Sequence, residues 1–164
     1  MFTTVRDFIT EWKYESQATG RVLEAMTDAS LSQRITSDNR TLGQLGWHLA
    51  TTIHEMLSRT GLEFPSLEGD EHAPASAAVI AESYKRASAD LLQAIETQWT
   101  DDTLVQLTDM YGEQWPNGLT LRILIKHEVH HRGQIYLMLG MLDVRTPPLY
   151  GLTEEQLRER SAPA

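Results

Sequence analysis

The stretch LTLRILIKHEVHHRGQIYLMLGMLD, Leu119–Asp143, decides the fold expected for this chain. Its apolar residues recur every three or four positions, which is the spacing of one helix face. Pro147 and Pro148 follow shortly afterwards, and proline cannot continue a helix. The sequence therefore predicts one long helix over 119–143 whose apolar stripe must be covered by other elements.

Three further segments have the same periodicity and can pack against that apolar stripe. They span residues 2–28, 41–60 and 75–99, and loops are expected over 61–74 and 100–118. Alternating strand patterns are nearly absent. The expected fold is all-α: an antiparallel four-helix bundle that forms one domain over 1–164. Thr153 and Gln156 have capping-box spacing, so a short extra C-terminal helix is expected over 153–160.

The composition limits the kinds of partner and metal site that this chain can have. The 164 residues include 23 Asp and Glu, 14 Lys and Arg, and no cysteine. The acidic balance and the lack of a basic cluster argue against nucleic-acid partners. No apolar run is long enough to span a membrane, no signal peptide is evident, and a cytoplasmic location is expected. Any metal must be held by His, Asp or Glu.

The histidines suggest such a metal. His127 and His131 are four residues apart, so they share one helix face with the apolar stripe. Two imidazoles facing a core are costly unless their nitrogens are satisfied, and a divalent ion satisfies one on each ring. His48, at the flank of the apolar stripe of 41–60, is the candidate third ligand. Three protein ligands leave an open position, which is typical of catalytic sites.

Other residues of the stretch receive weaker predictions. Glu128, His130 and Gln134 are candidate catalytic residues, and Gln134 is expected to donate a supporting hydrogen bond. His130 is turned about 100° from His131, toward a pocket rim or a subunit contact. Gly133 is expected to permit close helix approach, and Arg132 to pair with an acidic residue of a neighbouring helix. His54 and His72 are expected at the surface.

His127-Glu128-Val129-His130-His131 also matches the H-E-x-x-H pattern of zinc proteases, in which the glutamate is the general base. The extended form of that pattern needs a further histidine downstream, and none follows. Such proteases also hold peptides along a strand edge, for which no strand is predicted. A protease is therefore the least supported of the functions considered.

A second interpretation covers more of the chain. The run His127-x-x-x-His131-Arg132-Gly133-Gln134, together with Leu45-Gly46-Trp47-His48-Leu49-Ala50, resembles the DinB-like family of bacterial four-helix-bundle proteins. The resemblance implies a divalent metal held by His48, His127 and His131. Three imidazoles and a water suit zinc, nickel, iron or copper. Related members include transferases and isomerases that use a low-molecular-weight thiol such as bacillithiol or mycothiol.

Two functions of different classes are expected on this basis. The first is a metal-dependent enzyme that acts on small molecules, either a thiol-dependent transferase or a hydrolase. The second is a metal-binding stress-response protein without turnover. A homodimer is expected in either case, because symmetric dimers are the commonest oligomers.

Overall fold

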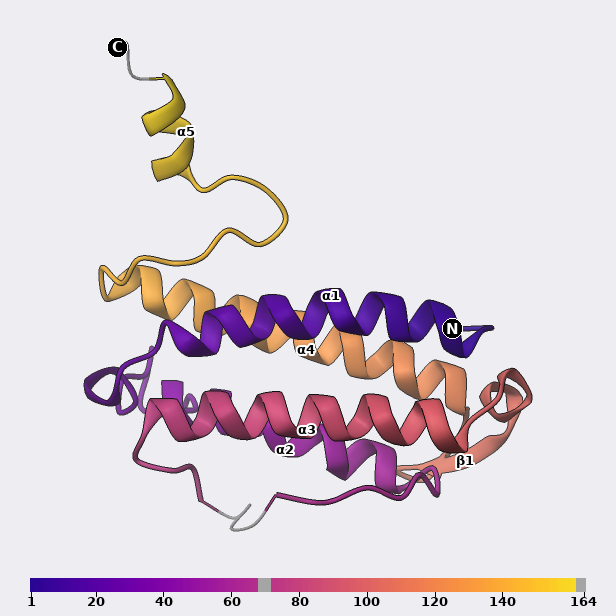
Figure 1. The fold of residues 1–164 in the computed structure, drawn as a ribbon. Coiled ribbons are helices and arrows are strands. Elements are labelled where there is room, and N and C mark those ends of the chain that lie inside the picture. Colours follow the sequence, from indigo (N-terminus) through magenta and orange to yellow (C-terminus); the bar gives the residue numbers. More distant parts are fainter. Residues whose placement is uncertain (68–71, 162–164) are drawn as a thin grey trace.

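Four long helices form a bundle in the computed structural model, which describes residues 1–67 and 72–161 (Figure 1). They are α1 (Val5–Glu24), α2 (Leu42–Ser58), α3 (Ala77–Gln98) and α4 (Asn117–Met141). A short helix, α5 (Glu154–Ser161), follows at the end of an arm that leaves the bundle. The predicted all-α class and the extra C-terminal helix are confirmed.

Capping residues explain where two of the helices begin. Thr41 accepts a hydrogen bond from the backbone N–H of Gln44, whose side chain accepts one from the backbone of Thr41. Thr153 and Gln156 repeat this reciprocal pair before α5. Each box satisfies two backbone donors that a helix start otherwise leaves without partners.

The four helices do not simply alternate in direction along the chain. Each of α1 and α2 packs against both α3 and α4, so α1 and α2 are diagonal to each other. Figure 1 shows α1 and α4 running in one direction and α2 and α3 in the other. Consecutive pairs α1/α2 and α3/α4 are therefore antiparallel, whereas α2 and α3 are parallel. The connection over 59–76 must join opposite ends of the bundle.

At two glycines, atoms of other segments lie so close to the helix that a side chain would not fit. A Cβ atom on Gly118, at the start of α4, would lie 2.3 Å from the carbonyl oxygen of Phe2. One on Gly46 of α2 would lie 2.9 Å from Met26 and 3.0 Å from Ile80. The expectation that Gly133 serves this purpose is wrong, because nothing lies within 4 Å of its added Cβ. Gly133 is exposed on α4.

The segment expected to be a loop over 100–118 contains regular structure, and the expectation is wrong there. A short 3-10 helix (Asp101–Val105) is followed by strands β1 (Leu107–Met110) and β2 (Glu113–Pro116), which pair as an antiparallel hairpin. Tyr111 and Gly112 make its turn with φ of 59° and 87°. Four-residue strands are too short to show alternation, and tyrosine is not a residue that signals such a turn.

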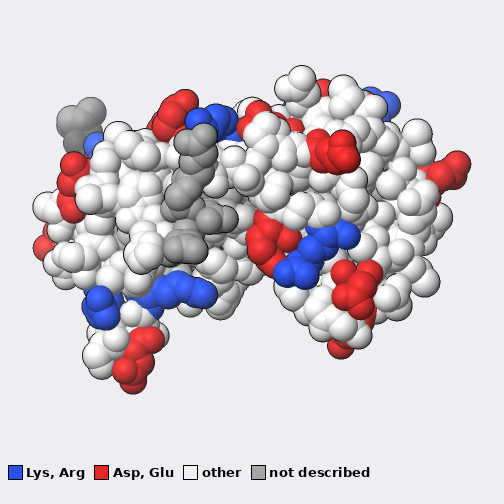
Figure 2. All heavy atoms as spheres, turned by 90° about the horizontal axis from the view of Figure 1, so that it is seen from below, with Lys and Arg blue, Asp and Glu red and all other residues white. Residues whose placement is uncertain are grey.

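Charged side chains of both signs share the surface. Figure 2 shows Lys and Arg interspersed with Asp and Glu on the face that it draws, rather than gathered by sign. Surface pairs such as Arg59 with Glu55, 2.8 Å apart, are part of this pattern. In the described ranges, every helix is too short or too polar to cross a bilayer.

Candidate metal centre

Three imidazoles converge between α2 and α4. His48 comes from α2, and His127 and His131 come from successive turns of α4. One nitrogen of each ring lies within 4.8 Å of the others. The Nε2 atoms of His48 and His127 are 2.9 Å apart. The structure thus brings together all three residues predicted as ligands, although they come from helices far apart in the sequence.

Neighbouring side chains orient two of these rings. His131 Nδ1 lies 2.6 Å from Oε1 of Gln134, so the ring donates its Nδ1–H there and keeps its Nε2 lone pair free. His48 Nδ1 lies 3.3 Å from the hydroxyl of Thr52, one turn along α2. Gln134 therefore supports the cluster, but its oxygen accepts a hydrogen bond, whereas a donated one was expected.

His127 shows that the cluster suits a cation. Its Nδ1 is buried and has no hydrogen-bond partner, and its Nε2 faces the Nε2 of His48. Two neutral imidazole nitrogens that face each other need either one shared proton or an electrophile between them. Three nitrogen donors that converge in this way are the ligand set that zinc and other first-row divalent ions bind. The residues present therefore fit a divalent metal ion.

The rings are held in the uncharged form that binds metals. Burial lowers the pKa of His127 to about 3, and the nearby charges of His131 and His48 add to the effect. Burial, then the positive charge of Arg40, lowers the pKa of His48 to about 4. Burial also lowers the pKa of His131, against a raising effect of the Gln134 hydrogen bond. At neutral pH all three imidazoles are neutral, so no proton competes with a cation.

Two cavities reach the cluster, one at His48 and one at His131. One, of about 330 Å³, is lined by His48, Thr52 and Glu55 of α2 and by Leu67. The other, of about 430 Å³, is lined by His131 and Gln134 of α4 and by the segment that precedes α2. Both are within the range of sizes that hold small molecules. A ligand can therefore reach an ion held by the three histidines.

The remaining histidines lie outside the cluster. His130 is exposed, and its ring centroid is 4.8 Å from that of His131. His72 is exposed as well. His54 is half-buried against Phe64, with ring centroids 5.0 Å apart, so it is less exposed than expected.

Glu128 points away from the three histidines. Its carboxylate is 1% exposed and accepts a short hydrogen bond from the hydroxyl of Tyr84 on α3. Burial raises the pKa of Glu128 to about 7, although hydrogen bonds from Tyr84 and Thr19 oppose the shift. This carboxylate is bound by Tyr84 in the bundle interior, so the geometry gives no support to a protease-type general base.

Glu128 is expected to make stability depend on pH. Its folded pKa of about 7 exceeds the unfolded value of 4.5, so its stabilising protonation is complete below pH 4.5 and is lost as pH rises through 7. Relative to Glu128→Gln, the wild-type protein should lose roughly 3 kcal/mol of unfolding free energy between pH 4.5 and 8. Urea titrations of both proteins across this range measure the difference.

The three clustered histidines change stability with pH in the opposite direction, and they do not obscure this result. Their lowered pKa values make the metal-free protein less stable as pH falls below 6.5. Because both proteins retain them, their contribution cancels in the comparison. Parallel pH profiles for wild type and Glu128→Gln would show that folding does not raise the pKa of Glu128.

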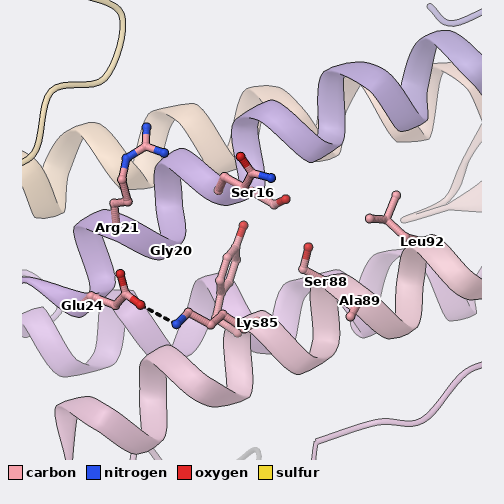
Figure 3. A pocket seen from close by; sticks show the side chains of 10 residues that line it. Ser16, Gly20, Arg21, Glu24, Lys85, Ser88, Ala89 and Leu92 are labelled. Carbon is pink, nitrogen blue, oxygen red and sulfur yellow. Dashed lines mark hydrogen bonds and ion pairs between the residues drawn. The ribbon is translucent and has the colours of Figure 1, made fainter.

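A further cavity, of about 390 Å³, lies between α1 and α3 (Figure 3). Ser16 and Gly20 of α1 face Ser88 and Ala89 of α3 across it, and a Lys85–Glu24 ion pair joins the two helices. The lining includes none of the three clustered histidines. The cavity therefore belongs to the α1/α3 packing and is separate from the metal centre.

Arg132 is buried on the far side of α4, as part of an ionic network. It is 1% exposed, and its Nη2 lies 2.6 Å from Oε2 of Glu15 on α1. Its Nη1 donates to the backbone oxygen of Glu15 and to the hydroxyl of Thr19. Tyr150, in the arm after α4, donates to the same carboxylate at 2.8 Å. The predicted pairing of Arg132 with an acidic residue of a neighbouring helix is confirmed.

The sequence analysis missed two residues beside the cluster. Thr52 lies four positions after His48, so the helical spacing that paired His127 with His131 would have found it. Arg40 precedes α2 in an irregular segment, and no local pattern indicates that it lines a cavity with His131. Only the path of the chain before α2 places it there.

Comparison with known proteins agrees with the fold. The family model described as the DinB family matches residues 1–162. The Bacillus subtilis (strain 168) protein YrdA is 42% identical over 156 residues, which are 95% of this chain and 93% of that protein. These matches cover both helices that carry the histidine cluster.

Solved structures give the same result. The crystal structure of a DinB-like protein from Bacillus cereus ATCC 10987 superposes with a TM-score of 0.87 at 37% identity, covering 92% of this chain and all of that one (100%). A DinB-like protein from Bacillus subtilis, YjoA, has a TM-score of 0.70 at 18% identity, covering 88% of this chain and 96% of its own. At this lower identity the likeness concerns the fold alone.

Proposed function

This chain belongs to the DinB family, and we propose that it binds one divalent metal ion through His48, His127 and His131 and acts as a metal-dependent enzyme on small molecules. The convergence of three neutral imidazoles carries the proposal. Family membership by itself identifies neither a metal nor a reaction.

Accessibility favours an enzyme over a purely structural metal site. A structural zinc is closed by four protein ligands, whereas three histidines form the group here among the described residues. Two cavities open at the group, one beside His48 and one beside His131. When bound, such an ion supplies Lewis-acid activation of a thiol or a water. A transferase that uses a small thiol and a hydrolase both use this chemistry.

The chain's own residues position the donors. Gln134 fixes the proton of His131 on Nδ1, which directs Nε2 toward the other rings. Thr52 lies against Nδ1 of His48 and restrains that ring in the same way. Such supporting contacts raise metal affinity because the rings lose little freedom when the ion binds. The remaining volume beside the cluster is available to a substrate.

Metal analysis tests the proposal. Protein purified without a nickel column should hold one ion per chain by mass spectrometry, and His48→Ala should weaken zinc affinity by about a hundredfold or more. His130→Ala is the matched control, because His130 is exposed beside His131 and has no place in the cluster. Equal metal content in wild type and His48→Ala would refute the three-histidine site.

Turnover separates an enzyme from a metal-binding protein without activity. The metal-loaded protein is expected to consume a thiol with an electrophile, or to hydrolyse an ester, in a screen of small substrates. His127→Ala should abolish the reaction, and His130→Ala should retain it. Full metal occupancy with no turnover across the screen would favour the non-catalytic stress-response function.

A further inference from the structure

The cavity beside His131 contains an arginine with no protein partner. Arg40 lies in the irregular segment before α2 and lines the 430 Å³ cavity together with Asn39, His131 and Gln134. Within the described part of the chain, its guanidinium makes neither a hydrogen bond nor an ion pair. Asp38 also lines the cavity, but it accepts a hydrogen bond from Ser37 and is not paired with Arg40.

Arg40 lies beside one ring of the cluster, because it lines the same cavity as His131. Arg34, in the same segment, instead donates to the carbonyl of Ser37 at 3.2 Å. Arg40 thus differs from its neighbour in facing a cavity that opens on the candidate metal centre.

This arrangement has an electrostatic consequence. A divalent ion held at His131 would repel the guanidinium of Arg40, because both residues line the same cavity. A small oxyanion bound in the cavity is attracted by both groups and removes the repulsion. Guanidinium groups also offer paired N–H donors that match carboxylate and phosphate oxygens.

We propose that Arg40 binds the oxyanion of a small substrate in this cavity, while another group of that substrate reaches the ion at His131. The inference rests on the proposed function and narrows its substrate class to small molecules that carry a carboxylate or phosphate. Arg40 is a specificity-determining residue in this scheme, and Asn39 and Gln134 supply amide groups on the same wall.

Two thiols that differ in one group test the inference. Cobalt(II)-loaded protein is titrated with 3-mercaptopropionate and with its neutral amide, and thiolate-to-cobalt absorption reports binding. Wild type should bind the acid roughly three- to tenfold more tightly than the amide. Arg40→Gln should bind both thiols equally and keep its full cobalt content. Arg34→Gln, in the same segment but bonded to Ser37, should retain the preference.

The outcomes separate this inference from the proposed function. Failure of cobalt to bind at all would overturn both. Normal cobalt binding with no preference for the acid in wild type, or with no thiol band at all, would overturn the role of Arg40 alone. Inorganic phosphate, added as a competitor, should displace the acid if the cavity takes any oxyanion, and leave it bound if the cavity is selective for carboxylates.

Discussion

Replacing Arg132 with alanine is expected to lower the free energy of unfolding by about 3–5 kcal/mol. The guanidinium is 1% exposed, and it neutralises the carboxylate of Glu15, whose side chain is 10% exposed. Its loss leaves that carboxylate buried without a counter-charge and removes the donor to Thr19. Urea unfolding at pH 7 measures the difference.

A second arginine on the same helix provides the control. Arg122 of α4 pairs with Glu11 of α1, but the two side chains are 29% and 36% exposed. Arg122→Ala should therefore cost no more than about 1 kcal/mol. Similar losses for Arg122→Ala and Arg132→Ala would show that burial of the Arg132 pair is unimportant.

The double substitution Glu15→Leu with Arg132→Met separates two causes of the stability loss. One is the lost attraction between the two side chains, and the other is a buried charge left without a partner. Replacing both partners of a buried pair by apolar groups is often close to neutral, because no charge is left without a partner. The double variant should recover most of the stability that Arg132→Ala loses. Tyr150, whose hydroxyl donates to Glu15, should then become less ordered, which hydrogen exchange of the arm after α4 would detect.

Replacing His127 with leucine is expected to reverse the order of stability between metal-free and zinc-loaded protein. Without metal, the variant should be more stable by about 1 kcal/mol, because it removes a buried nitrogen that has no partner. With zinc at a thousand times its dissociation constant, wild type should gain about 4 kcal/mol and the variant nothing. Thermal unfolding in chelator and in zinc gives both comparisons.

His130→Leu is the matched control for this reversal. It lies on the same helix, is exposed, and should retain the full stabilisation by zinc. Equal stabilisation of wild type and His127→Leu by zinc would place the ion elsewhere. A metal-free His127→Leu less stable than wild type would show that the ring is favourably packed. The expected result means that the histidine cluster lowers the stability of the metal-free protein and raises it when an ion is bound.

Local periodicity predicted the helices well but did not determine how they are arranged. The four helices follow from apolar spacing within each segment, and the starts of α2 and α5 follow from capping residues three positions apart. The direction of α3 relative to α2 depends on the connection over 59–76, which has no pattern of its own. The hairpin over 107–116 escaped prediction because its strands are only four residues long.

Part of the candidate site likewise follows from the sequence, and part follows only from how the helices pack. The shared orientation of His127 and His131 is fixed by the geometry of one helix, so the sequence by itself determined it. The orientation of Glu128, which contacts Tyr84, was only partly determined by the sequence. The helix turns it about 100° from His127, and α3 supplies its partner. Residue spacing did not single out His48 as the third ligand, whereas the resemblance of its segment to a known family did.

Only the tertiary structure decided that His48 meets the other two histidines and that Arg40 lines the same cavity. His48 is 79 residues from His127, and its position depends on how α2 packs against α4 along their whole length. Helical spacing fixes directions within one rigid element because each residue adds a constant rotation and rise. Contacts between elements result from many weak packing interactions across the bundle, and no short stretch of sequence contains them.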